Sequence, residues 1–258
     1  MRSTIACAAS LLTLTLVGCV TSSSSPTPQS KSSPRLAAKY NARLAMGYMQ
    51  QGHMDLAQSK LAEALRQGPK MPLVHNALAL YYERTGRPAE ADHQYKLSLG
   101  YDPGNPNTQN NYGAFLCRQG KYRQSIGYFV KASNNLDYST PDGALANAGL
   151  CALEIPDKAL ARKYFMQALA INRDQNQALW HLGLLGFEAN DYSVANNYLS
   201  RLIDLVPHPS ALMLWVAIEA AWASGHKTQA QHYGRELLKL YPNSSEAQKF
   251  IHLVGAGS

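Results

Sequence analysis

The side chains able to act as nucleophiles, general bases or metal ligands in this 258-residue chain are four cysteines, eight histidines and a scatter of carboxylates. No two histidines stand four residues apart around a glutamate, as the helix of a zinc hydrolase requires. No Gly-rich phosphate loop and no Gly-x-Ser-x-Gly nucleophile elbow is present in the sequence. We therefore expect no enzyme activity, no metal and no cofactor, which leaves the cysteines as the residues to explain.

The composition is that of an ordered chain, because 46% of the residues are hydrophobic and 16% are charged. The formal net charge is +7, from 24 basic and 17 acidic residues. The basic residues are scattered and form no cluster typical of nucleic-acid binding. We expect neither a nucleic acid nor a small-molecule substrate as a partner. Four cysteines are also too few for a small disulfide-rich scaffold.

The first cysteine-containing motif lies at the N-terminus. An apolar run over residues 5–17 follows a short positive start at Arg2. The run is shorter than the roughly 20 residues that span a bilayer, and it has the proportions of a secretory signal peptide. It ends in Leu16-Val17-Gly18-Cys19, which resembles the bacterial lipobox. The alternative is an ordinary signal peptide with a chance cysteine.

The lipobox resemblance implies that residues 1–18 are removed and that Cys19 becomes the lipidated N-terminus. A thioether-linked diacylglycerol and an N-acyl chain would anchor it stably, since each buried methylene contributes about 0.8 kcal/mol. Residue 20 is Val, not the Asp that keeps enteric-type lipoproteins at the inner membrane. We expect a lipid-anchored protein of the outer membrane that faces the periplasm.

The next segment is polar and repetitive in composition. Residues 21–34 are all Ser, Thr, Pro, Gln or Lys, which bury too little apolar surface to fold. We expect residues 19–36 to form a lipidated tether. In the polyproline form, its Ser/Thr/Pro-rich part would reach roughly 40 Å at about 3.1 Å per residue.

From residue 37 to residue 243 the chain repeats a pattern every 34 residues. Small residues recur at the eighth, twentieth and twenty-seventh positions, a larger residue at the twenty-fourth, Gly at the fifteenth and Pro at the thirty-second. The glycine permits the left-handed conformation that ends a first helix, and the proline stops a second one. The six copies cover residues 38–71, 72–105, 106–139, 142–175, 176–209 and 211–243.

This pattern resembles the tetratricopeptide repeat. The resemblance implies an all-α fold, a right-handed superhelical solenoid of six helix hairpins, because one hairpin alone cannot bury its apolar face. Residues 244–258 are expected to add a C-terminal capping helix and tail, with Ser244 as the N-cap.

Two cysteines fall on the first helices of neighbouring repeats, Cys117 and Cys151. A disulfide needs Cα atoms within about 7 Å, whereas the axes of packed helices lie about 8 to 10 Å apart. We therefore expect two buried thiols rather than a bridge.

The tetratricopeptide resemblance implies that partners bind along the first helices, which line the concave face. Repeats one to four place there an apolar patch and several amides that can hold a peptide backbone; these residues are Met46, Met49, Leu80, Asn76, Asn110, Asn111 and Asn147. Repeats five and six place aromatic residues there, namely Trp180, Phe187, Trp215 and Trp222.

Two interpretations of the four aromatic residues compete. They can capture an apolar segment of a partner, since aromatic residues dominate interface hot spots. They can instead be covered by Phe250, Ile251 and Val254 of the C-terminal helix, which we favour because an open patch of that size risks aggregation. Met46, Met49 and Leu80 have no obvious covering segment and are the preferred partner site, with inter-repeat core as the alternative.

Three segments narrow the assignment further: Asn110-Asn111-Tyr112-Gly113-Ala114-Phe115-Leu116, residues 161–172, and Leu237-x-x-Leu240-Tyr241-Pro242. Together with the lipobox and the tether they resemble the PilF/PilW family of type IV pilus biogenesis lipoproteins. The resemblance implies a pilotin, which binds the secretin subunit and promotes its localisation and multimerisation at the outer membrane. The alternative is a tetratricopeptide lipoprotein that scaffolds other envelope-assembly or peptidoglycan proteins.

Overall fold

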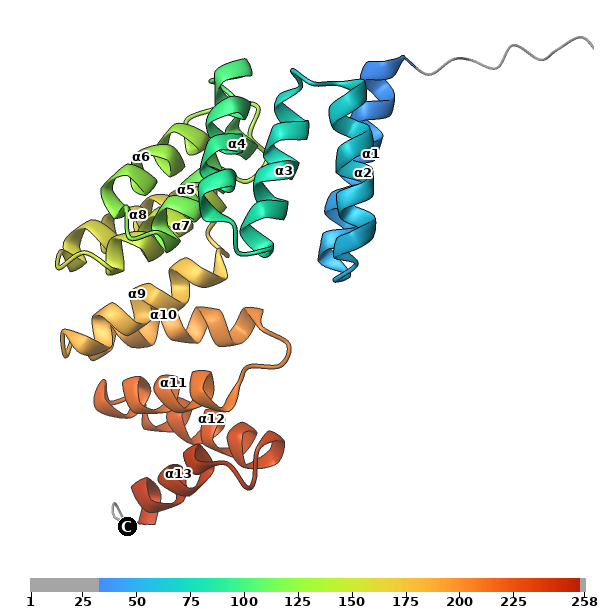
Figure 1. The fold of residues 1–258 in the computed structure, drawn as a ribbon. Coiled ribbons are helices and arrows are strands. Elements are labelled where there is room, and N and C mark those ends of the chain that lie inside the picture. Colours follow the sequence, from blue (N-terminus) through green and yellow to red (C-terminus); the bar gives the residue numbers. More distant parts are fainter. Residues whose placement is uncertain (1–32, 256–258) are drawn as a thin grey trace, which may run out of the picture. The chain divides into compact units, whose positions relative to one another are not determined.

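The computed structural model describes residues 33–255, so the predicted signal peptide, Cys19 and most of the predicted tether lie outside the described residues. The described range holds thirteen α-helices and no strand (Figure 1). None of these helices is long and apolar enough to cross a membrane. The helices are α1 (Pro34–Gln50), α2 (Met54–Gln67), α3 (Pro72–Arg84), α4 (Pro88–Tyr101), α5 (Pro106–Arg118), α6 (Tyr122–Ser133), α7 (Pro141–Leu153), α8 (Lys158–Ile171), α9 (Asn176–Glu188), α10 (Tyr192–Leu205), α11 (Ala211–Ala223), α12 (Lys227–Leu240) and α13 (Ser245–Gly255).

The start of α1 corrects one predicted boundary. Residues 34–36 were expected to belong to the tether, yet α1 begins at Pro34. Proline is well suited to the first helical position, because its fixed φ matches the helix and its missing N–H has no partner there anyway. The compact helical unit accordingly starts at Pro34.

Consecutive helices pack in pairs, α1 with α2 through α11 with α12, as the repeat pattern predicts. The pairs approach closely because a small residue of the first helix faces a large residue of the second. A Cβ added to Gly149 would lie 2.6 Å from the ring of Phe165, and one added to Gly183 would lie 2.6 Å from Leu199. Both large side chains are buried. Glycine at the eighth position thus makes room for the large side chain at the twenty-fourth position.

The helix pairs turn at the predicted position. Gly52, Gly86, Gly120 and Gly225 all have positive φ, between 70° and 85°, at the fifteenth residue of their repeats. Repeat five has Asn190 there with φ 57°, and Asn is among the few residues besides glycine that tolerate this conformation. In repeat four the position is Pro156, after α7 has already ended at Leu153.

Successive pairs stack through the second helix of one pair and the first helix of the next, as α6 packs on α7 and α10 on α11, and several first helices also contact one another. α1 contacts α3, α3 contacts α5, α5 contacts α7, α7 contacts α9, and α11 contacts α13. We call the surface formed by these helices the first-helix face. Neighbouring pairs share continuous apolar clusters, such as the one in which Tyr95, Tyr112 and Phe115 pack together between the second and third pairs. All three side chains are buried.

The last helix, α13, has the predicted N-cap. The Oγ atom of Ser244 accepts a hydrogen bond from the backbone N–H of Ala247 at 3.1 Å. α13 packs against α11 and α12, and its Phe250 is buried against Gly234 of α12. Ile251 was expected to cover the aromatic residues, but it is 54% exposed, so that expectation is wrong for this side chain.

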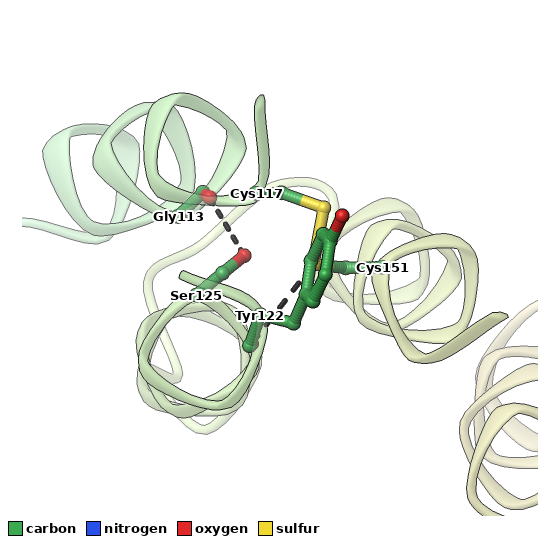
Figure 2. The surroundings of a disulfide bond; sticks show 5 residues. All are labelled: Gly113, Cys117, Tyr122, Ser125 and Cys151. Carbon is green, nitrogen blue, oxygen red and sulfur yellow. Dashed lines mark hydrogen bonds between the residues drawn. A yellow bond between two sulfur atoms is a disulfide. The ribbon is translucent and has the colours of Figure 1, made fainter. Parts of the chain in front are cut away.

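Cys117 of α5 and Cys151 of α7 form a disulfide, which corrects the expectation of two thiols (Figure 2). Their Cα atoms are 5.9 Å apart. The prediction compared the distance between helix axes with the limit for Cα atoms. Each Cα atom lies about 2.3 Å from its helix axis, so atoms on facing sides come closer than the axes do.

Candidate protein-binding site

A hollow of about 460 Å³ lies on the first-helix face between α3 and α5. Its lining combines apolar side chains with charged and amide side chains, which are the groups that bind and orient a peptide. The lining residues are Leu80, Glu83, Arg84, Asn111, Ala114 and Arg118. A second hollow of about 380 Å³ shares two of these residues, Glu83 and Arg118, which form an ion pair that borders both hollows.

Glu83 is held in place from two sides. Its Oε1 accepts a hydrogen bond from the hydroxyl of Tyr95, and its Oε2 pairs with the guanidinium of Arg118. The Tyr95 ring is completely buried, and burial together with the Glu83 charge raises the pKa of its hydroxyl. Tyr95 therefore remains a donor to Glu83. The side chain of Arg118 is 59% exposed, so it can also reach a partner.

Arg84 joins the second repeat to the first. Its Nη1 donates to the backbone carbonyl of Met49 at the end of α1. A guanidinium carries five N–H donors and remains charged at any physiological pH, so this bond leaves donors for a ligand. Arg84 and Arg118 belong to neighbouring first helices and line the same hollow, which is therefore suited to an acidic group or a row of backbone carbonyls.

Asparagine side chains join three neighbouring first helices. Nδ2 of Asn111 donates to Oδ1 of Asn76 at 3.2 Å, and Nδ2 of Asn147 donates to Oδ1 of Asn110 at 3.1 Å. Asn76 is only 4% exposed and holds Asn111, so the prediction that Asn76 contacts a partner does not fit the structure. Asn111 and Asn147 are half-buried, and each retains a second amide hydrogen and its carbonyl oxygen.

The three residues of the predicted apolar patch, Met46, Met49 and Leu80, do not lie together on one exposed surface. Leu80 is half-buried and lines the hollow, and Met46 is half-buried against the first apolar cluster. Met49 is 3% exposed and lies within that cluster, so the prediction of a partner contact there does not fit the structure. Small residues explain its burial, because Ala42 and Ala45 allow α1 to pack closely on its neighbours.

The four predicted aromatic residues of repeats five and six, Trp180, Phe187, Trp215 and Trp222, are all half-buried and pack against one apolar cluster. Lys249 of α13 lies 5.8 Å from the Trp215 ring centre, and Lys227 lies 5.6 Å from that of Trp222. α13 therefore flanks this group without enclosing it. Burial raises the pKa of nearby Glu219, against the opposite effect of Lys249.

Three contacts between neighbouring repeats, an ion pair, a hydrogen bond and a disulfide, were not predicted from the sequence. Glu83 and Arg118 are 35 residues apart, as are Asn76 and Asn111, and the bonded cysteines are 34 apart. Each spacing is about one repeat, which brings the paired residues to similar heights on neighbouring first helices. This spacing was visible in the sequence and marked these residues as candidates for contact, but the rotation between neighbouring pairs decides which of them meet.

Within residues 33–255 no group of three or more His, Cys, Asp or Glu side chains is arranged to hold a metal ion. The hollow holds fixed charges, amides and apolar side chains. Such a set recognises a ligand but has no nucleophile paired with a base. The geometry is that of a binding surface.

Comparison with known proteins agrees with this architecture. A family model described as a tetratricopeptide repeat matches residues 43–106. The type IV pilus assembly protein PilF of Pseudomonas aeruginosa is 31% identical over 241 residues, which cover 93% of this chain and 95% of PilF. The chain belongs to the PilF/PilW family.

Solved structures of the family have the same fold. The structure of Pseudomonas aeruginosa PilF has a TM-score of 0.73 at 29% identity and covers 86% of this chain and 99% of PilF. That of PilW, described as a widely conserved type IV pilus biogenesis factor, has a TM-score of 0.68 at 27% identity, covering 83% of this chain and 98% of PilW. The predicted all-α tetratricopeptide solenoid is confirmed, and family membership gives the chain a role in type IV pilus biogenesis.

Proposed function

We propose that this PilF/PilW-family protein is a pilotin, an outer-membrane lipoprotein that binds the secretin subunit and promotes its localisation and multimerisation. The observation that carries the proposal is the hollow between α3 and α5, which Arg84 and Arg118 line together with apolar side chains, in a protein of pilus biogenesis. A protein partner is the ligand class that such a surface on a repeat solenoid fits.

The residues that line the hollow indicate which side chains the bound secretin segment carries. An apolar side chain of the segment packs on Leu80 and Ala114, and an acidic side chain or backbone carbonyls accept hydrogen bonds from Arg84 and Arg118. The fixed carboxylate of Glu83 repels an acidic group placed on the wrong side of the arginines. The second amide hydrogen of Asn111 remains for the backbone.

Lipid on Cys19, which lies outside the described residues, would supply the second part of the mechanism. An anchor restricts the search for the secretin to a membrane surface and so raises the effective concentration of both proteins. The sequence supports this step through the lipobox resemblance of Leu16-Val17-Gly18-Cys19.

The test of binding is capture of purified secretin subunit by residues 34–258, which form a compact unit. We expect Leu80→Asp and Arg118→Ala each to weaken capture about tenfold or more, because each removes a central contact of the interface. Lys158→Ala is the matched control, since Lys158 also pairs across repeats, with Glu188, but lies away from the hollow. Unchanged capture by a folded Leu80→Asp protein would contradict the site.

The test of delivery is a Cys19→Ser protein made in the cell. We expect it to bind the secretin subunit in solution and to fail in outer-membrane secretin assembly. Normal assembly would show that the lipid is not needed. If capture from envelope extracts enriches other assembly proteins without the secretin, the scaffold alternative replaces the pilotin.

A further inference from the structure

The outer face of α1 combines exposed apolar side chains with basic residues only. Tyr40 is 60% exposed and Leu44 is 44% exposed, one helical turn apart, and Leu36 one turn earlier is 41% exposed. The charged residues of α1 are Arg35, Lys39 and Arg43, and the helix has no acidic residue.

The exposed stripe points away from the rest of the helical stack. The buried residues of α1 are Ala38, Ala42, Ala45 and Met49, which face the neighbouring helices α2 and α3. At 100° per residue, Tyr40 and Leu44 lie on the opposite side of the helix. α1 belongs to the first pair of the stack (Figure 1), so no earlier pair in the described chain packs on this side.

The two ends of the solenoid differ in polarity. A terminal repeat normally presents a polar outer surface, because nothing stacks on it. At the C-terminal end, α13 exposes Gln248, Lys249 and His252, with Ile251 as its large exposed apolar side chain. The N-terminal end instead exposes a row of large apolar side chains flanked by cations. This combination is typical of a helix that lies in the interface of a membrane.

We propose that the outer face of α1 docks onto an anionic phospholipid surface, with Tyr40 and Leu44 entering the headgroup region and Lys39 and Arg43 contacting phosphates. Tyrosine favours this interfacial region, and each nearby cation adds to the attraction for anionic lipids. A second copy of the chain is a poorer occupant, because a symmetric contact would bring two faces carrying only positive charge together.

The length of the segment between Cys19 and α1 also favours a membrane surface as the occupant of this face. Fourteen residues separate Cys19 from Pro34, which at about 3.5 Å each allow a reach of at most about 50 Å. If Cys19 is lipidated as proposed above, α1 is the first helix of the described residues that follows the anchor. Docking would then hold the binding face in a defined orientation to the membrane.

The test uses residues 34–258 without any lipid anchor, so that its result does not depend on Cys19. Residues 34–258 form a compact unit with its own packed helices, so we expect this unit to fold without residues 1–33. We expect it to sediment with vesicles of phosphatidylethanolamine and phosphatidylglycerol, less so at high salt, and not with vesicles of phosphatidylcholine alone.

Two α1 variants locate the contact. Lys39→Gln with Arg43→Gln should weaken vesicle binding about 30-fold, since two cations near an anionic surface are removed. Tyr40→Ser with Leu44→Ser should weaken it to a similar or greater extent. All four side chains are exposed, so both variants should keep the fold, which circular dichroism checks.

α8 provides the matched control, because it exposes the same kinds of residues. Lys158→Gln with Lys163→Gln, and Met166→Ser with Ile171→Ser, change two exposed cations and two apolar side chains that are 52% and 53% exposed. We expect both to bind vesicles normally. The proposal is overturned if the unaltered protein ignores anionic vesicles, if the α1 variants bind as well as it does, or if it forms a dimer that the α1 variants abolish. Secretin capture is measured on the same proteins, so failure of the pilotin proposal is seen separately.

Discussion

Cys117 and Cys151 are 34 residues apart in the chain and joined through their sulfur atoms, with Cα atoms 5.9 Å apart. The bond links α5 to α7 and so ties the third helix pair to the fourth. In a solenoid each pair is stabilised only by its own packing and by its neighbours. A covalent link at one interface therefore increases the cooperativity of unfolding between the N-terminal and C-terminal halves.

Replacing both bonded cysteines should lower the stability of the helical unit. A link between residues 34 apart restricts the unfolded chain, and the chain-entropy model assigns it about 3 to 4 kcal/mol. Urea unfolding of the Cys117→Ser, Cys151→Ser protein, followed by circular dichroism, measures the difference. A reductant should shift the unaltered protein toward the variant and leave the variant unchanged. Equal stability of the two proteins without reductant would contradict the prediction.

Glu83 should matter for stability as well as for binding. Glu83→Ala removes the acceptor of the completely buried Tyr95 hydroxyl, and an unpaired buried hydroxyl costs about 1 to 3 kcal/mol. Adding Tyr95→Phe to Glu83→Ala should recover part of this loss, because the unpaired hydroxyl is then gone.

The exposed pair of Lys158 and Glu188 is the comparison for Glu83. Its side chains are 70% and 54% exposed, so Glu188→Ala should change the free energy of unfolding by no more than about 0.5 kcal/mol. Urea unfolding of the four proteins measures these differences. If Glu83→Ala lowers the free energy of unfolding no more than Glu188→Ala does, the hydrogen bond from Tyr95 to Glu83 contributes little to stability.

The repeat pattern predicted the helix pairs because it encodes local packing. Gly149 and Phe165 lie within one hairpin, and their sizes alone require that the two helices approach at that point. The left-handed turn at Gly86 is likewise a property of a few consecutive residues. Such features follow from sequence spacing and backbone sterics.

Contacts between repeats were harder to predict, since they depend on how the pairs stack. Met49 was placed on the surface by its position in the repeat, yet the closeness of α1 to its neighbours buries it. The partners of Glu83 and Cys117 lie one repeat away, and which atoms meet depends on the rotation between pairs. The candidate site was therefore found in outline, as the first-helix face, while its hydrogen bonds were not.

Gly234 should control the docking of α13. A Cβ at this position would lie 2.0 Å from the ring of Phe250, so Gly234→Ala forces the ring out of place. Overpacking of this kind costs about 1 to 3 kcal/mol. We expect faster proteolysis within α13 and a change in the fluorescence of Trp215, which α13 flanks through Lys249.

Gly127 provides the control for this substitution. It lies in α6, and a Cβ there meets nothing within 4 Å. Gly127→Ala should therefore raise stability by about 0.5 to 1 kcal/mol through helix propensity. If Gly234→Ala also raises stability and leaves proteolysis of α13 unchanged, Phe250 does not anchor the last helix.

His181 should make the stability of the helical unit sensitive to mild acid. Its ring stacks on Phe165 with 5.2 Å between ring centres, and burial lowers its pKa. Between the lowered pKa and the unfolded value of about 6.5, the unfolded state binds more protons than the native state. Stability should therefore decrease as pH falls below about 6.5, and the decrease should be complete once pH lies below the folded pKa.

A His181→Phe protein isolates this contribution, because phenylalanine keeps an aromatic contact with Phe165 and cannot take up a proton. Urea unfolding about one unit above and one unit below pH 6.5 gives the change in stability with pH for each protein. The unaltered protein should lose more stability on acidification than His181→Phe. Equal losses in the two proteins would show that burial of this ring does not oppose its protonation.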